Sequence, residues 1–166
     1  MTTTPVAQPT SVSVLPQTGS VGDDAEKLIK LLVECYVNLL NNISIGKPKK
    51  DALSSLDDVF EETCKPEWDG YSACAVSFES YVEAKKFIYL FPTSLSTPEV
   101  AADPDGEISL EWYVAPNRVF SVSVGPNGEL NYAGIFGPNK THGVEVFFDE
   151  IPKVVLENVR RVYGLI

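Results

Sequence analysis

The chain is poor in the residues and motifs that mark several large classes of protein. Its three cysteines in 166 residues are too few for a disulfide scaffold, and none of them forms a Cys-x-x-Cys pair. No apolar run approaches the roughly 20 residues that cross a bilayer. No Gly-x-Gly-x-x-Gly, P-loop or Gly-x-Ser-x-Gly motif occurs. The sequence therefore predicts neither a membrane partner nor a cofactor.

Basic residues are also scarce. Lys and Arg number 13 against 23 Asp and Glu, which gives a formal net charge of −10. Direct binding to a nucleic acid needs a basic surface, so this balance argues against it. The N-terminus has no basic segment followed by an apolar one, as a secretory signal would have. We therefore expect a cytoplasmic protein with its cysteines reduced.

The composition favours one globular domain preceded by a tail. Residues 1–22 are mainly Thr, Ser, Pro, Gln and Val, without Lys or Arg, and are expected to form a disordered tail. Hydrophobic residues make up 44% of the chain, which is enough for a core. We predict a single domain over residues 23–166, mostly helical over 23–92, with a β-meander over 98–148 and a last helix over 149–163.

Helical patterns dominate the first half. A capping box at Asp23 and an apolar stripe predict a helix over residues 23–42. Leucines exposed along this stripe would favour a homodimer, and buried ones a monomer. The basic segment 46–50 is expected to be a solvated connector. Residues 51–64 form a weaker helical pattern, and Ser77 can cap a helix that runs to about Phe91. The apolar stripe of the helix expected over residues 23–42 consists of Leu28, Leu31, Leu32, Cys35 and Leu39.

Regular turn signals indicate a β-meander of four to five strands. Pro-Asp-Gly or Pro-Asn sequences occur at residues 104–106, 116–117, 126–128 and 138–139, each between short β-prone runs. Proline presets the first position of such a turn, and glycine adopts the positive φ that closes it. Turns at this spacing are typical of consecutive antiparallel strands. Residues 144–148 are expected to form the fifth strand.

Three-residue turns predict a strand register. Val124 should lie opposite Leu130, and Val100 opposite Leu110. The register gives one apolar sheet face and one polar face. The apolar face would contain Val100, Ile108, Leu110, Trp112, Val114, Phe120, Val122, Val124, Leu130, Tyr132 and Phe136. The polar face would contain Glu99, Glu107, Ser109, Glu111, Tyr113, Ser121, Ser123, Glu129 and Asn131.

The last helix completes an α+β fold. It should begin near Asp149 and carry its arginines at the C-terminal end, where they suit the helix dipole. Its apolar stripe would pack on the apolar sheet face, together with the earlier helices. The polar face would then remain open on its other side.

Carboxylates concentrate on the predicted open face. Residues 87–152 contain nine acidic residues and two basic ones. The register places Glu99 opposite Glu111, which is unfavourable for a sheet. These acids predict a docking surface for a basic partner protein. Asp103 and Asp105 also begin like a calcium loop, but the remaining ligands are missing. The candidate residues are Glu99, Asp103, Asp105, Glu107, Glu111 and Tyr113.

Two further clusters carry candidate functions. Trp68 and Tyr71 flank Asp69-Gly70 and could anchor an interface, or form a tight turn whose rings cover the edge of the core. His142 is the only histidine. Together with Asp103, Glu107 and Glu111 it defines an alternative hypothesis, a small enzyme or a protein that binds a metal or small ligand. Without a catalytic motif, we predict a non-enzymatic protein.

The order of several blocks resembles a family of small bacterial proteins for which no activity is established. The blocks are Trp-Asp-Gly-Tyr at 68–71, Asp-Pro-Asp-Gly-Glu-Ile-Ser-Leu-Glu-Trp at 103–112, Phe-Ser-Val-Ser at 120–123, Tyr-Ala-Gly at 132–134, His-Gly at 142–143 and Ile-Pro at 151–152. The resemblance covers residues 66–163 and implies a bacterial or phage-related cytoplasmic protein. The resemblance implies no chemistry; the net charge of −10, its concentration in the sheet and the absence of a catalytic motif lead us to expect an inhibitor- or antitoxin-like interaction module.

Overall fold

A computed structural model describes residues 27, 30–31 and 46–165. The chain divides into two units, residues 1–38 and 39–166. The described residues of the first unit, 27, 30 and 31, are helical. The expected tail over 1–22 and the rest of the expected helix over 23–42 lie outside the described residues. Everything that follows concerns the second unit.

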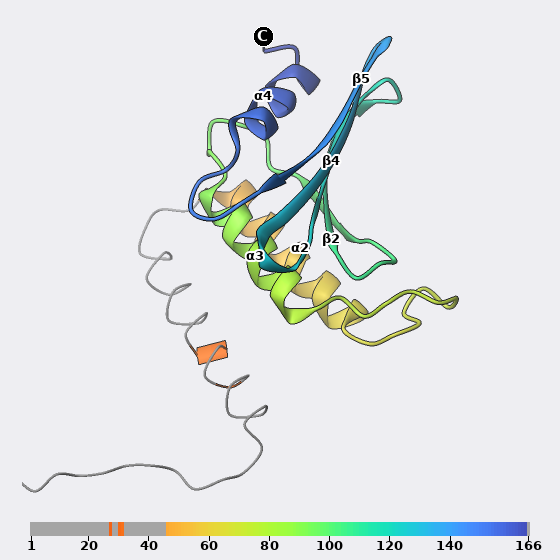
Figure 1. Ribbon diagram of the computed structural model, residues 1–166. Helices are drawn as coiled ribbons and strands as arrows, with labels where there is room; N and C mark the ends of the chain where they lie inside the picture. The colour runs from red at the N-terminus through yellow and green to blue at the C-terminus, as the bar shows by residue number, and fades with distance from the viewer. Residues whose placement is uncertain (1–26, 28–29, 32–45, 166) are drawn as a thin grey trace, which may run out of the picture. The chain divides into compact units, whose positions relative to one another are not determined.

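The second unit has the expected α+β architecture. Two helices precede a five-stranded antiparallel sheet in the order β1-β2-β3-β4-β5, and a last helix follows it. Figure 1 shows the three helices on one side of the sheet. The elements are α2 (Lys47–Thr63), α3 (Phe78–Leu90), β1 (Glu99–Ala102), β2 (Ile108–Ala115), β3 (Arg118–Val124), the short 3-10 turn η1 (Pro126–Gly128), β4 (Glu129–Phe136), β5 (Asn139–Val146) and α4 (Lys153–Val162).

The predicted register is confirmed. Val100 pairs with Leu110 and Val124 with Leu130. The fifth strand begins at Asn139 rather than at residue 144, because the turn at Gly137 is tight enough for Asn139 to pair directly with Phe136. Residues 140–143 are polar or small, so the sequence did not identify them as a strand.

Large aromatic side chains fill the space between the helices and the apolar sheet face. Trp112, Phe87 and Phe120 are fully buried, and the indole Nε1 of Trp112 donates to the Ser96 carbonyl at 2.7 Å. Val114 was expected on this face but is 42% exposed. A register shift between residues 113 and 115 turns it away from the core.

The first turn of α2 corrects the expected connector at residues 46–50. Pro48 lies within the first two positions of the helix, where its missing N–H costs nothing. Lys49 is only 7% exposed, and its Nζ donates to the carbonyls of Tyr89 at 2.8 Å and Phe91 at 2.6 Å. Burial lowers the pKa of this lysine. Lys49 therefore ties α2 to the C-terminal end of α3, where a cation also suits the helix dipole.

Replacing Lys49 with methionine should lower the free energy of unfolding by about 2 kcal/mol, because it leaves the Tyr89 and Phe91 carbonyls, at the end of α3 and its C-cap, without this donor. Methionine keeps the unbranched apolar stem, so packing changes little. Lys50→Met, at the exposed neighbouring position, is the matched control. Urea denaturation of the two variants measures the difference, and equal losses would contradict the capping role.

The other helices agree with the sequence except at one boundary. Ser77 caps α3 as expected, since its side chain accepts from the Ser80 amide. The last helix begins at Lys153 rather than near Asp149, because Pro152 occupies the N-cap position. Arg160 and Arg161 lie in its last turn, as expected.

Candidate functional site

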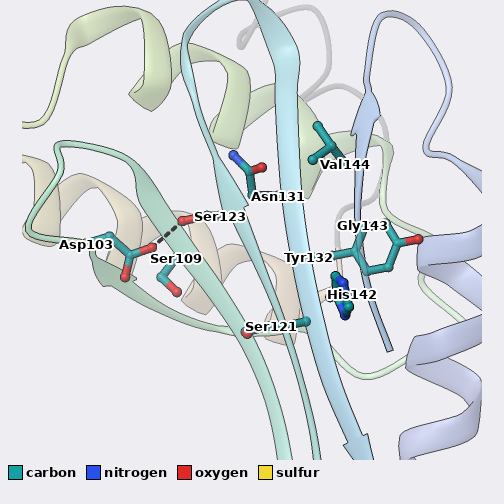
Figure 2. A pocket seen from close by; sticks show the side chains of 10 residues that line it. Asp103, Ser109, Ser121, Ser123, Asn131, Tyr132, His142, Gly143 and Val144 are labelled. Carbon is teal, nitrogen blue, oxygen red and sulfur yellow. Dashed lines mark hydrogen bonds between the residues drawn. The ribbon is translucent and has the colours of Figure 1, made fainter. Parts of the chain in front are cut away.

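The candidate site is the sheet face opposite the core. Its centre carries only small or short side chains, which leave a shallow groove of about 430 Å³. Ser109 pairs with Ser123, which pairs with Asn131, so these three side chains form one row across the sheet. Figure 2 shows the residues that line the groove. They are Asp103, Ser109, Ser121, Ser123, Asn131, Tyr132, Ala133, His142, Gly143 and Val144.

Carboxylates gather at the β1–β2 end of this face. Glu99 pairs with Glu111, as predicted. In the turn between the strands, the Asp103 amide donates to the Glu107 carbonyl at 2.9 Å, and the Glu107 amide donates to Asp105 Oδ1 at 3.2 Å. Figure 2 shows the Ser123 hydroxyl hydrogen-bonded to Asp103. The turn thus holds three acidic residues within one short hairpin.

Burial and the neighbouring acids shift the pKa of Glu107. Burial raises the pKa of its carboxyl above the usual range, and the charges of Asp105 and Asp103 raise it further. The nearby side chains of Ser123 and Asn131 oppose the rise. Its ionised form is therefore less stable in the folded chain than in the unfolded chain.

No basic side chain within residues 46–165 neutralises the acids of this face. The ion pairs among these residues join Lys47 to Asp51, Lys85 to Asp57 and Lys86 to Asp149. None of them includes Glu99, Glu111 or the three acids of the turn. A cationic ligand or partner would supply the missing countercharge.

Replacing Glu107 with glutamine should raise the Tm at neutral pH. The folded carboxyl holds its proton at a pH where the unfolded chain has already lost it, so stability falls as pH rises through that window. Glutamine removes this loss. The gain should vanish below about pH 4, where glutamate is protonated in both states. Thermal melts across pH test this, with Glu157→Gln on an exposed helix position as control. A pH-independent gain would contradict the assignment.

The loop between α2 and α3 joins the aromatic candidates to the acidic turn. Asp69 Oδ1 accepts from the Tyr71 amide at 2.8 Å, and Trp68 Nε1 donates to the Cys74 carbonyl at 2.9 Å. The Cys74 amide in turn donates to the Pro104 carbonyl at 2.8 Å. The loop is thus anchored beside the β1–β2 turn. Tyr71 is 86% exposed, whereas Trp68 is half-buried.

His142 lies at the other side of the face. It pairs with Ala133, which follows Ser121 and Glu111 in one row across the sheet. Three strand spacings therefore separate the backbones of Glu111 and His142, about 14 Å. Asp103 and His142 line the same groove, but the strand register does not bring Glu111 and His142 together as an acid–base pair. Within the described part of the chain, no group of three or more potential ligands is arranged for a metal ion.

Some features of this face did not stand out in the sequence. Val144 is 60% and Val146 54% exposed on the groove side of β5, and Phe148 beyond them is 68% exposed. The alternation of Val144 and Val146 indicates that both side chains lie on one face of a strand. The sequence predicts a strand over 144–148 without assigning its side chains to either face of the sheet. The sequence correctly placed Ser109, Ser121 and Ser123 on the open face, but it did not indicate that they line a groove.

Comparison with protein-family models, with curated proteins and with solved structures finds no match to this chain. Among the described residues, no helix has the length and apolar character needed to cross a membrane. The function therefore has to be argued from the geometry of the open face.

Proposed function

We propose that this protein is a non-enzymatic interaction module that docks its acidic open sheet face on a basic surface of a partner protein. The observation that carries the proposal is the row of acids along β1 and β2, from Glu99 to Glu111, without a basic partner in the described chain. No described helix covers this face of the five-stranded sheet (Figure 1).

The cost of this arrangement supports a functional origin. Opposed carboxylates such as Glu99 and Glu111 destabilise a sheet. Burial and neighbouring acids also disfavour the ionised form of Glu107. A basic partner would offset the repulsion between Glu99 and Glu111 and would stabilise the ionised form of Glu107. Charge complementarity would also raise the association rate. Sites that are unfavourable alone and favourable in a complex are expected for a binding surface.

Aromatic side chains at the border of the acidic face suit an interface. Tyr113 on β2 is 51% exposed, and Tyr71 projects from the loop beside the acidic turn. Tyrosine is enriched among the residues that dominate binding energies. The partner would thus meet the carboxylates of β1 and β2 with tyrosines beside them.

The kind of partner follows from the charge. A nucleic-acid-binding enzyme or a toxin has a basic surface that an acidic mimic can cover, so the protein would act as an inhibitor or antitoxin. The resemblance of residues 66–163 to a bacterial family supports a bacterial or phage-related, cytoplasmic setting. The His142 alternative has less support, because three strand spacings separate His142 from Glu111.

The test is capture of the partner at two salt concentrations. The immobilised full-length chain is incubated with lysate of a closely related host at low ionic strength, then washed at high ionic strength. We expect one stoichiometric protein with a basic surface, released by salt, because screening weakens exposed charge pairs. A stoichiometric partner that resists salt, or an acidic one, would contradict the proposal.

A further inference from the structure

We propose that the outer edge of β5, which pairs with no strand of the described chain, pairs with β5 of a second copy and joins two sheets into one continuous antiparallel sheet. This inference does not depend on the proposed function, since it concerns β5, whereas the acids of the proposed interface lie on β1, β2 and their turn. Within residues 46–165, the strand order gives β5 one neighbour, β4. Figure 1 shows β5 at the margin of the sheet.

The register identifies which backbone groups of β5 are unpaired within the described sheet. The Phe147 amide donates to the Gly128 carbonyl at 2.7 Å, and the strand register runs without a shift from this pair to the Asn139–Phe136 pair. In an antiparallel ladder every second residue turns its N–H and C=O to the neighbouring strand. The odd-numbered residues of β5 therefore face β4. The outward groups belong to Lys140, His142, Val144 and Val146.

This edge lacks the usual protection against pairing. Neither a proline nor a bulge interrupts it over residues 139–146, and Lys140 at its start is the only basic residue on it. The opposite edge differs, because β1 has four residues and α2 packs against it. Two valines stand exposed beside the outward amides of β5, at 60% and 54% of their full accessibility. Such an edge is a template for an added strand.

The charges along β5 favour its own antiparallel copy as the added strand. Lys140 lies near the start of the strand, and Val146 at its end pairs with Glu129 of β4. Antiparallel pairing brings Lys140 of each copy beside Val146 of the other, on the side of the sheet that carries Glu129 of the other. The strand itself carries one lysine and one glutamate, and the acids of β1, β2 and their turn lie three or more strands away.

A pairing centred on Gly143 satisfies both strands. It places His142 opposite Val144 of the second copy, and Lys140 opposite Val146 of the second copy, so every outward N–H and C=O of these residues gains a partner. Facing residues share one side of the sheet, so the valines of each copy are covered by the stems of His142 and Lys140. The two grooves would then face the same side, since both are lined by His142 and Val144.

Oligomeric state tests the proposal directly. Sedimentation equilibrium of the full chain should show a species of twice the 18.2 kDa chain mass, increasing with protein concentration. Val144→Pro should abolish it, because proline removes an outward N–H without breaking the β4–β5 ladder. The preceding Gly143 tolerates the restriction that proline imposes. Val144→Thr, which keeps the N–H and the β-branched shape, should still dimerise.

Two outcomes would overturn the proposal. One is a wild-type chain that stays monomeric at the highest soluble concentration. The other is a folded Val144→Pro variant, with wild-type circular dichroism, that still dimerises. If Val144→Pro does not fold, the double variant His142→Lys and Val144→Lys replaces it. This variant sets lysines opposite each other at exposed positions, and dimerisation that survives it would contradict the β5 pairing.

Discussion

Gly128→Ala, in the turn between β3 and β4, is expected to be among the most destabilising single substitutions, lowering the free energy of unfolding by roughly 3–5 kcal/mol. Gly128 has a φ of +74°, and a Cβ atom at this position would lie 2.1 Å from the Phe147 carbonyl oxygen. The backbone cannot move away cheaply, because the Phe147 amide donates to the Gly128 carbonyl at 2.7 Å. Phe147 is itself buried against Phe87, so the shift would spread into the core.

Gly137→Ala provides the matched control. Gly137 also has a positive φ, +64°, but nothing lies within 4 Å of an added Cβ. Its substitution should cost about 1 kcal/mol, which is the backbone term alone. Urea denaturation of both variants separates the contact from the backbone conformation. Equal losses at the two positions would mean that the Gly128–Phe147 contact does not limit the fold.

The double variant Glu99→Lys and Glu111→Lys is expected to weaken binding to the basic partner by about 100-fold or more, because two attractive contacts become repulsive. The effect should fall mainly on the association rate, and raising the salt concentration should reduce it. Titration of the captured partner by calorimetry measures the affinity, and stopped-flow mixing measures the rate. A loss of affinity of this size would show that the interface includes β1 and β2.

The matched control changes the same net charge on another surface. Asp58→Lys and Glu157→Lys lie at exposed positions of α2 and α4 and take part in none of the described ion pairs. This control should keep most of the affinity. An equal loss in both double variants would show that overall charge, rather than the acidic face, attracts the partner.

The sheet was predictable because its turns and its alternation agree. Pro126-Asn127-Gly128 fixes a short loop with positive φ at Asn127 and Gly128, and a one-residue slip would move the whole apolar set of each strand to the wrong face. The pairs Val100–Leu110 and Val124–Leu130 follow directly. Val114 was misplaced because a bulge is a local irregularity that the alternation does not contain.

The elements that were missed depend on tertiary contacts. Lys49 looks like part of a solvated basic loop until α3 presents two carbonyls to its Nζ. The start of β5 has no apolar alternation, and only its pairing with β4 makes residues 139–143 a strand. Single-sequence patterns cannot show contacts between elements that are distant along the chain.

The candidate site was predictable in its charges and not in its shape. The opposition of Glu99 and Glu111 followed from turn length alone. The groove required knowing that Ser109, Ser121 and Ser123 stand on neighbouring strands, where short side chains leave a hollow. The anchoring of the Trp68 loop beside the acidic turn required the Cys74–Pro104 hydrogen bond, which joins residues 30 positions apart.

Mapping the surface that the captured partner covers would test the central claim most directly. Backbone amide resonances of the isotopically labelled chain are followed while the unlabelled partner is added. The docking hypothesis predicts that shifts concentrate on β1, β2 and their turn, with Glu99, Glu107 and Glu111 among the most affected residues. Shifts confined to the outer faces of α2, α3 and α4, with these strands unchanged, would contradict it.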